Sequence, residues 1–441
     1  MLNVKKKDLN KSIFAAFLQQ IFKIVLKSYI NMILGHNMIN IGQTLKELRE
    51  HCGLSLVDVK EKTQITDSRL CKFENGQNDL KFDEILTLLR AYKKNPIDFL
   101  FENALINDTD IKNSNTLEPR IKDSKSKVLT FIDLFAGVGG IHLGFSSYAK
   151  CLMASEIDKA ACTTYHANFE DTPIVGDITK QEIKDQIPQD FDILCGGFPC
   201  QAFSIAGYQK GFEDARGNLF FDIMDIVKTR KPRAIFLENV KNLLGHDSGN
   251  TFKVIKELLE EQGYFVYHKV LNSFEYGNIL QNRERIYIVA FNKQKVPNYM
   301  DFTYPEKIKL EDNEMSYYLD DNADKSFYYT DASIIYDRIK DEITDQNTFY
   351  QWRRVYVRAN KKGVCPTLTA NMGTGGHNVP LIRVHDGIRK LTPRECFNLQ
   401  GFPRDFVLPN LAKSKLYKQA GNSVTVPVIK RIAHEIIKII R

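Results

Sequence analysis

Short apolar segments alternate with longer helical segments between residues 128 and 292, and this alternation constrains the fold more than any other feature. The apolar segments are residues 128–135, 151–156, 174–175, 191–197, 234–240 and 285–291. When strands alternate with helices along a chain, each helix returns the chain across the sheet, so that neighbouring strands run in the same direction. The pattern therefore predicts a parallel, doubly wound α/β sheet.

Composition excludes several other classes of protein. Of the 441 residues, 43% are hydrophobic and 26% are charged, which is typical of a globular chain and not of a disordered one. The net charge of +7 permits a polyanionic partner without requiring one. The eight cysteines form no C-x-x-C pair, which argues against a disulfide framework or a metal site. We therefore expect a reducing, cytoplasmic location and no bound metal.

The sequence divides into further regions by composition. An apolar segment near the amino terminus has helical spacing, but lysines and glutamines interrupt it, so we expect an amphipathic helix and no membrane partner. We expect Met38, immediately before the helical domain, as an alternative start of the protein. The expected regions are an extension (1–37), a helical domain (38–102), a polar linker (103–127), the α/β domain (128–292, completed by 418–441) and a tyrosine-rich domain (293–417).

The helical domain is predicted to contain four short helices. The first begins near residue 45 and ends at Gly53, and a capping box of Ser55 with Asp58 begins the second. Thr66 is the expected cap of the third helix, residues 67–74, and the fourth covers residues 82–92.

A glycine-rich turn follows the first apolar segment, in the sequence DLFAGVGG at 133–140. Ligands of doubly wound sheets bind at the carboxyl ends of the strands, where glycines let the backbone approach them. Glu156 ends the next strand, where a carboxylate can bind ribose hydroxyls, and Asp177 lies in a later turn, where it can accept from an adenine amine. The alternative is a tight turn with two solvated acids.

Polar residues also follow three other strands. Cys200 lies on a loop in which Pro199 interrupts regular structure, and a thiolate there can act as a nucleophile, although most cysteines are inert packing. Glu238 ends an apolar strand, and a carboxylate is costly to bury without a partner, so an active-site role is favoured. Arg283 and Arg285 share one face of a strand, and the alternative for them is an exposed edge.

Eight motifs occur in an order that resembles the DNA cytosine-5 methyltransferases of type II restriction-modification systems. They are DLFAGVGG, ASEID, GDI, GGFPCQAFS, LENV, QNRERIY, RKLTPRECFNLQGFP and QAGNSVTVPV. The resemblance implies a Rossmann-like domain with an irregular target-recognition domain, S-adenosyl-L-methionine as cofactor, double-stranded DNA as substrate and catalysis by a monomer. It also implies a cognate restriction endonuclease that acts on the same site without a required complex.

The resemblance implies a role for each candidate catalytic residue. The target cytosine is flipped out of the duplex, and Cys200 adds to its C6 so that C5 can attack the donor methyl. Glu238 holds N3 and the exocyclic amine, and Arg285 contacts the O2 side of the base. Arg283 helps to position Cys200 and the flipped nucleotide.

The same resemblance implies the cofactor contacts. Phe135 stacks near the adenine, Glu156 binds the ribose, Asp177 binds the adenine amine and Asn422 binds the methionine end. Ile157 stands where the family often has an aromatic residue, which weakens one wall of the site. The other implied cofactor contacts are Gly137, Gly139, Gly140, Ile178 and Pro199.

A segment of the tyrosine-rich domain is predicted to contact DNA. Basic and aromatic residues alternate within 350–380, a composition that suits phosphate and base-edge contact, with a solvated strand as the alternative. This segment is similar to those of enzymes that act on CC-N-GG, CC-W-GG or CCGG sites. The implied contacts there are Arg353, Arg354, Arg358, Thr367 and Thr369.

The helical domain resembles helix-turn-helix modules of the Cro/repressor type. Its recognition helix would present Asp67, Ser68, Arg69 and Lys72 to a major groove. The resemblance also implies that the protein binds DNA as a dimer and represses its own operon. The chain departs from that pattern in two ways, with Lys60 at a usually small position and Gln64 at the turn glycine. The alternative is a structural or non-specific DNA-binding role.

Three rival functions make different demands on the sequence. A catalytically idle DNA-binding regulator would lack Cys200 or Glu238, and both are present. An RNA cytosine methyltransferase would have a small recognition domain and no helix-turn-helix. An NAD enzyme would have the complete G-x-G-x-x-G pattern, which fails at His142.

Overall fold

The computed structural model describes residues 41–77, 80, 82–92, 128–198, 219–308, 313–360, 363–374 and 378–441. The chain divides into two compact units near residue 124, and each unit is considered by itself. Among the described residues, no helix is long and apolar enough to cross a membrane. The expected amino-terminal helix and the polar linker lie outside the described residues.

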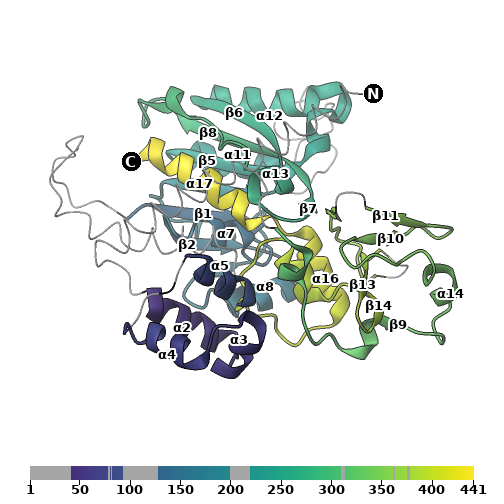
Figure 1. The fold of residues 1–441 in the computed structure, drawn as a ribbon. Coiled ribbons are helices and arrows are strands. Elements are labelled where there is room, and N and C mark those ends of the chain that lie inside the picture. The colour runs from purple at the N-terminus through teal and green to yellow at the C-terminus, as the bar shows by residue number, and fades with distance from the viewer. Residues whose placement is uncertain are drawn as a thin grey trace, which may run out of the picture. The chain divides into compact units, whose positions relative to one another are not determined.

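The described residues of the first unit form four short helices, as expected from the sequence (Figure 1). They are α2 (Ile41–His51), α3 (Leu56–Thr63), α4 (Asp67–Glu74) and α5 (Phe82–Ala91). The capping box of Ser55 and Asp58 begins α3, as predicted. Thr66 occupies the N-cap position of α4, as predicted, although its side chain makes no capping hydrogen bond within the described part of the chain.

A buried ion pair connects two of these helices, and a left-handed residue ends a third. Arg49 of α2 donates to both carboxylate oxygens of Glu74 at 2.7 and 2.8 Å, and both side chains are buried. Gln64 ends α3 in the left-handed conformation, with φ of 63°. Glycine adopts this conformation without strain, which explains why a glycine is usual at this turn.

The second unit is built on a seven-stranded sheet in the order β3-β2-β1-β4-β5-β8-β6. Its strands are β1 (Thr130–Leu134), β2 (Lys150–Ser155), β3 (Ile174–Val175), β4 (Ile193–Gly197), β5 (Ala234–Val240), β6 (Tyr264–Asn272) and β8 (Glu284–Asn292). The prediction of a parallel sheet is wrong at one edge, where β8 runs antiparallel to both β5 and β6. Residues 273–283 between β6 and β8 contain a single short helix, which is too little chain for a parallel crossover.

Helices cover both faces of this sheet. On one face, α17 packs with α7 against the sheet, and its buried residues Val428, Ile432 and Ile436 join Phe131 and Phe236 in one apolar cluster (Figure 1). On the other face, α11 and α12 contribute to a second cluster. The helices are α7 (Gly140–Phe145), α8 (Lys159–His166), α9 (Gln181–Lys184), α11 (Leu219–Arg230), α12 (Asn250–Glu261), α13 (Ser273–Gly277) and α17 (Val426–Ile440).

A smaller antiparallel sheet lies between β8 and the carboxyl-terminal helices in sequence. Its order is β11-β10-β13-β14-β9, and a short parallel pair, β7 with β12, joins this region to the larger sheet. The elements are β7 (Gln281–Asn282), β9 (Tyr328–Tyr329), α14 (Tyr336–Ile339), β10 (Tyr350–Trp352), β11 (Val357–Ala359), β12 (Cys365–Pro366), β13 (Leu381–Val384), β14 (Gly387–Lys390), α15 (Pro393–Asn398) and α16 (Lys413–Asn422).

One buried acid in the large sheet has no counterpart in the sequence predictions. Asp133 lies in β1 beside Cys195 of β4, it is fully buried, and neither of its carboxylate oxygens has a hydrogen-bond partner among the described residues. Burial raises the pKa of Asp133 to about 8, because the charged form loses its hydration. The folded protein therefore holds a proton on Asp133 below that pH.

We expect the substitution Asp133→Asn to remove a pH dependence of stability. The pKa of about 8 lies above the unfolded value of 3.8, so the contribution of this carboxyl is complete below pH 4 and is lost as the pH rises toward 8. The free energy of unfolding of D133N, measured in urea relative to the unaltered protein, should therefore increase from pH 5 to pH 8. An equal difference at both pH values would contradict the assignment.

Candidate active site

The glycine-rich turn after β1 depends on its glycines for two different reasons. Gly137 and Gly139 have positive φ values of 58° and 87°. A Cβ atom at Gly139 would lie 2.2 Å from the ring of Phe169, whereas one at Gly137 would face open space. Packing therefore requires glycine at 139, and the backbone at 137 has room beside it for a ligand.

Glu156 lies beside this turn, as the sequence predicts. Its Oε2 atom accepts a hydrogen bond from the Gly137 amide at 2.8 Å, and its Oε1 atom accepts from the amides of Ile157 and Asp158 at 2.8 and 2.7 Å. The carboxylate thus connects the end of β2 to the turn after β1. Ile157 is 72% exposed, so its side chain contributes little to the protein core.

The remaining expected cofactor residues lie at the ends of other elements. Asp177 accepts hydrogen bonds from the amide and the hydroxyl of Thr179 at 3.0 and 2.8 Å, and these bonds lower its pKa. Ile178 is buried in the core, and Phe135 packs partly buried against the same apolar cluster. Asp177 is therefore an ionised acceptor, and Ile178 acts through packing.

Asn422 is brought to the glycine-rich turn by the carboxyl-terminal segment. Its side chain is exposed at the end of α16. A Cβ atom at Gly140 would lie 2.8 Å from both Ser423 Oγ and Val424 Cγ2, so this segment packs directly against the start of α7. Residues far apart in sequence therefore meet at the carboxyl end of β1.

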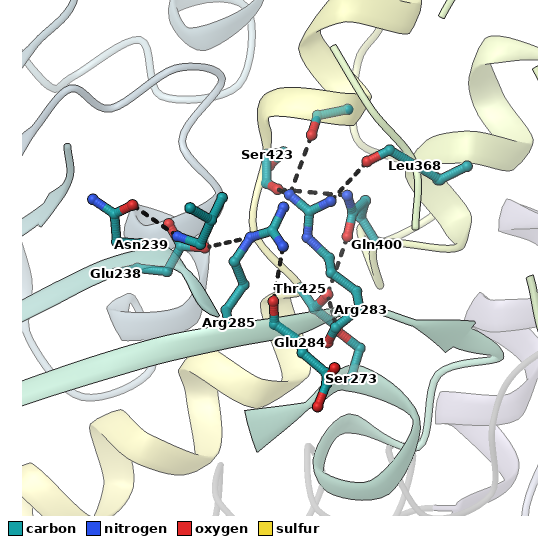
Figure 2. Close-up of polar contacts among 12 residues, drawn as sticks. Glu238, Asn239, Ser273, Arg283, Glu284, Arg285, Leu368, Gln400, Ser423 and Thr425 are labelled. Carbon is teal, nitrogen blue, oxygen red and sulfur yellow. Dashed lines mark hydrogen bonds and ion pairs between the residues drawn. The ribbon is translucent and has the colours of Figure 1, made fainter. Parts of the chain in front are cut away.

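An acid and an arginine meet where β5 ends and β8 begins (Figure 2). Arg285 Nε lies 3.1 Å from Glu238 Oε1, and Arg285 also donates to the carbonyl of Glu284 at 2.8 Å. Glu238 is 8% exposed. Burial raises its pKa, although the nearby guanidinium groups of Arg285 and Arg283 oppose that effect. The carboxyl therefore holds a proton more readily than an ordinary glutamate does.

The end of β4 lies next to this acid. Gly197 is the register partner of Glu238, and a Cβ atom at Gly197 would lie 3.5 Å from Glu238 Oε2. The carbonyl of Phe198 accepts a hydrogen bond from Asn239 at 2.9 Å. The expected nucleophile Cys200, together with Pro199, lies outside the described residues, so its position relative to Glu238 stays a prediction.

Arg283 contacts backbone carbonyls rather than another charged side chain (Figure 2). It is 2% exposed and donates to the carbonyls of Leu368, Gly421 and Ser423 at 2.8, 3.1 and 2.6 Å. Burial lowers its pKa to about 9. Arg283 is therefore part of the scaffold that holds together the start of β8, residue 368 and residues 421–423.

Neutral polar residues extend this scaffold, and sequence reasoning missed them. Gln281 donates to the carbonyl of Leu399 at 2.7 Å, and Gln400 donates to the carbonyl of Ala420 at 2.8 Å. The hydroxyls of Ser273 and Thr425 lie 2.7 Å apart. A buried glutamine gives no periodic signal, and the available sequence signal was the position of Gln281, Gln400 and Thr425 inside the QNRERIY, NLQGFP and GNSVTVP motifs.

The candidate DNA contacts of the smaller sheet form two separate groups. Arg353, Arg354 and Arg358 are exposed on the β10–β11 hairpin, where Arg354 has a positive φ of 64°. Thr367 follows β12 and donates to the carbonyl of Asn282 at 2.6 Å, and the exposed Thr369 donates to Asn371 at 2.5 Å. The arginines lie on a hairpin, whereas the threonines lie close to Arg283.

The expected recognition helix α4 presents part of its predicted set to solvent. Ser68 and Lys72 are exposed. Arg69 instead forms an ion pair with Glu84 at 3.0 Å, and Asp67 lies 3.6 Å from Lys60. Of the four predicted contacts, Ser68 and Lys72 are therefore the most accessible to a ligand that binds this face of α4.

Comparison with known proteins agrees with this geometry. A family model described as C-5 cytosine-specific DNA methylase matches residues 129–438, and a helix-turn-helix domain model matches residues 40–96. The type II methyltransferase M.Bsp6I of Bacillus sp. (strain RFL6) is 55% identical over 315 residues, which cover 70% of this chain and 99% of that protein. The type II methyltransferase M.SsoII of Shigella sonnei is 39% identical over 414 residues, which cover 90% of this chain and 98% of that protein.

A solved structure supports the fold of the larger unit. The Entamoeba histolytica methyltransferase EhMeth matches with a TM-score of 0.54 and 19% identity, over 71% of this chain and 99% of that chain. This likeness concerns the fold alone. Through the family match over residues 129–438, the chain belongs to the C-5 cytosine-specific DNA methylases, and it carries a helix-turn-helix domain ahead of the methylase domain.

Proposed function

We propose that this enzyme transfers the methyl group of S-adenosyl-L-methionine to C5 of a cytosine within a specific double-stranded DNA site. The observation that carries the proposal is the buried pair of Glu238 and Arg285 at the carboxyl edge of the sheet, beside the end of β4. An acid whose pKa burial raises can present a proton to N3 of a base, and the adjacent guanidinium can contact O2.

The described residues suit the cofactor. The open space beside Gly137, the carboxylates of Glu156 and Asp177 and the exposed amide of Asn422 all lie at carboxyl ends of strands or at the adjacent segment. They offer acceptors for ribose hydroxyls and an adenine amine and a polar group for the methionine end. When bound, the sulfonium cofactor supplies an electrophilic methyl group.

The chain's own residues perform the remaining steps. The Cys200 thiolate forms a bond to C6 of the flipped cytosine, while the Glu238 carboxyl group shares a proton with N3, so that C5 becomes nucleophilic. After C5 has gained the methyl group, a base removes the C5 proton, the bond between Sγ and C6 breaks, and the thiolate is released. Arg285 holds the O2 side of the ring, and Arg283 keeps the surrounding backbone in place.

We expect a duplex that contains 5-fluorocytosine at the target position to trap the enzyme covalently at Cys200. Fluorine cannot leave as a proton does, so the adduct at C6 persists after methyl transfer. Mass spectrometry of the trapped peptide identifies the residue. Cys200→Ser should bind DNA but transfer no tritium from labelled cofactor to duplex DNA, and the control Cys71→Ser, at an exposed cysteine of the first unit, should stay active. Turnover by C200S, or transfer to RNA instead of DNA, would overturn the proposal.

We propose that the target is of the CC-N-GG, CC-W-GG or CCGG type and that methylation protects it from a cognate endonuclease. The exposed arginines of the β10–β11 hairpin and the threonines after β12 supply the groups for phosphate and base-edge contact.

We expect bisulfite sequencing of DNA from a host that expresses the gene in its cytoplasm to show cytosines that resist conversion in one such sequence. The same host carrying C200S serves as the control and should show none. Methylation confined to a different sequence would contradict the site assignment while leaving the methyl-transfer proposal intact.

We also propose that the helix-turn-helix domain binds an operator upstream of its own gene as a dimer. The exposure of Ser68 and Lys72 on α4 supports this role, since a recognition helix must present polar side chains to a major groove. Structural or non-specific DNA binding is the alternative.

We expect removal of residues 1–102 to abolish a gel shift on the upstream intergenic DNA and to spare methyl transfer. Scrambled DNA of the same length is the control for non-specific binding. Retention of the promoter footprint by the truncated protein, or equal binding of both DNAs by the full chain, would contradict operator recognition.

A further inference from the structure

We infer that Arg283 is a positioning residue that couples the binding of DNA to the binding of the cofactor. Its guanidinium holds the backbone of residue 368 on one side and the backbone of residues 421 and 423 on the other. These segments contain the proposed DNA contacts Thr367 and Thr369 and the proposed cofactor contact Asn422. The inference rests on the proposed function and names a regulatory property of the same site.

On the DNA side, residues 367–368 form hydrogen bonds with the three consecutive residues 281–283. Leu368 donates its amide to Gln281 Oε1 at 3.1 Å, while its carbonyl accepts from Arg283 at 2.8 Å. Thr367 donates to the carbonyl of Asn282, the residue between them, at 2.6 Å. A movement of residues 367–368 on DNA therefore acts directly on residues 281–283.

The contact on the cofactor side surrounds Asn422. The same terminal nitrogen of Arg283 donates to the carbonyls of Gly421 and Ser423, the two chain neighbours of Asn422. A Cβ atom at Gly421 would lie 2.2 Å from the carbonyl carbon and oxygen of Thr369, so the two backbones are already in contact. No space separates the DNA segment from the cofactor segment at this point.

A second connection runs parallel to the first through two buried glutamines. Gln281 Nε2 lies 3.2 Å from Gln400 Oε1, and Gln400 Nε2 donates to the carbonyl of Ala420 at 2.8 Å (Figure 2 shows Gln400 beside Arg283 and Thr425). Gln281 and Gln400 are fully buried. Both connections therefore begin at residues 281–283 and end at residues 420–423.

This arrangement gives a physical reason for coupling. Arginine has a rigid planar fork, so the positions of its acceptors are fixed relative to one another. A ligand that fixes residues 421–423 thereby fixes residue 368 in advance, and the second ligand meets a segment that is already ordered. Linkage requires the effect to be equal in both directions.

The experiment uses the full chain and S-adenosylhomocysteine, which binds without reacting. The dissociation constant is measured for a duplex that carries the target sequence identified by bisulfite sequencing, with and without this probe. The ratio of the two dissociation constants is the coupling factor. We expect about tenfold tighter DNA binding with the probe in the unaltered protein. In Arg283→Lys, which retains the charge but loses the fork, we expect a factor below about threefold.

A matched control separates coupling from general destabilisation. Arg431 on α17 also donates from a partly buried guanidinium to a backbone carbonyl, that of Tyr276 at 2.8 Å, but it lies outside both connections. Arg431→Lys should leave the coupling factor unchanged. If Arg283 had a purely structural role, its substitution would weaken the binding of DNA and of the probe separately. The coupling factor, which is the ratio of the DNA dissociation constants with and without the probe, would then stay unaltered.

A second variant keeps the test decisive. If R283K does not fold by circular dichroism, Gln400→Met, which removes the second connection with little change in volume, should lower the factor instead. A factor near one in the unaltered protein, or an unchanged factor in the folded variants, overturns the inference. Failure of the probe to bind the unaltered protein at all would instead count against the proposed function.

Discussion

A carboxylate and a guanidinium lie 3.1 Å apart where β5 ends and β8 begins, in a position almost closed to water. An unpaired charge in such a place would be costly, so Glu238 and Arg285 stabilise one another. The antiparallel placement of β8 is what makes the pair, because it brings the start of β8 to the end of β5. The same edge receives the end of β4, from which the chain continues to Cys200.

The edge that carries Glu238 and Arg285 depends in turn on segments that are distant in sequence. Arg283, next but one to Arg285, is held by the carbonyls of Leu368 after β12, Gly421 near the end of α16 and Ser423 just beyond it. The final helix α17 lies in the same apolar cluster as strands β1 and β5. The large sheet is therefore covered on one face by α17, and the segment with the predicted DNA contacts Thr367 and Thr369 lies between β8 and α17 in sequence.

Local sequence signals predicted much of this protein. The strands β1, β4 and β5, the glycine-rich turn and the four helices of the first unit follow from apolar spacing, glycine and capping residues, which act over a few neighbouring positions. The contact between Glu156 and Gly137 was also predictable, because adjacent parallel strands end at the same edge of a sheet. The order of motifs identified the family without any tertiary information.

Other features depended on long-range packing. The sequence alone marked the candidate site residues, since strand ends, glycines and an acid after an apolar strand are recognised from their immediate neighbours. The tertiary structure alone decided that β8 is antiparallel, that Arg69 pairs with Glu84, that Asp133 is fully buried and that Arg283 bonds to three carbonyls. The physical reason is that strand direction, burial and hydrogen-bond partners are fixed by contacts between distant segments, such as the bond from Arg283 to the carbonyl of Ser423, 140 residues further along, and such contacts leave no periodic pattern in the chain itself.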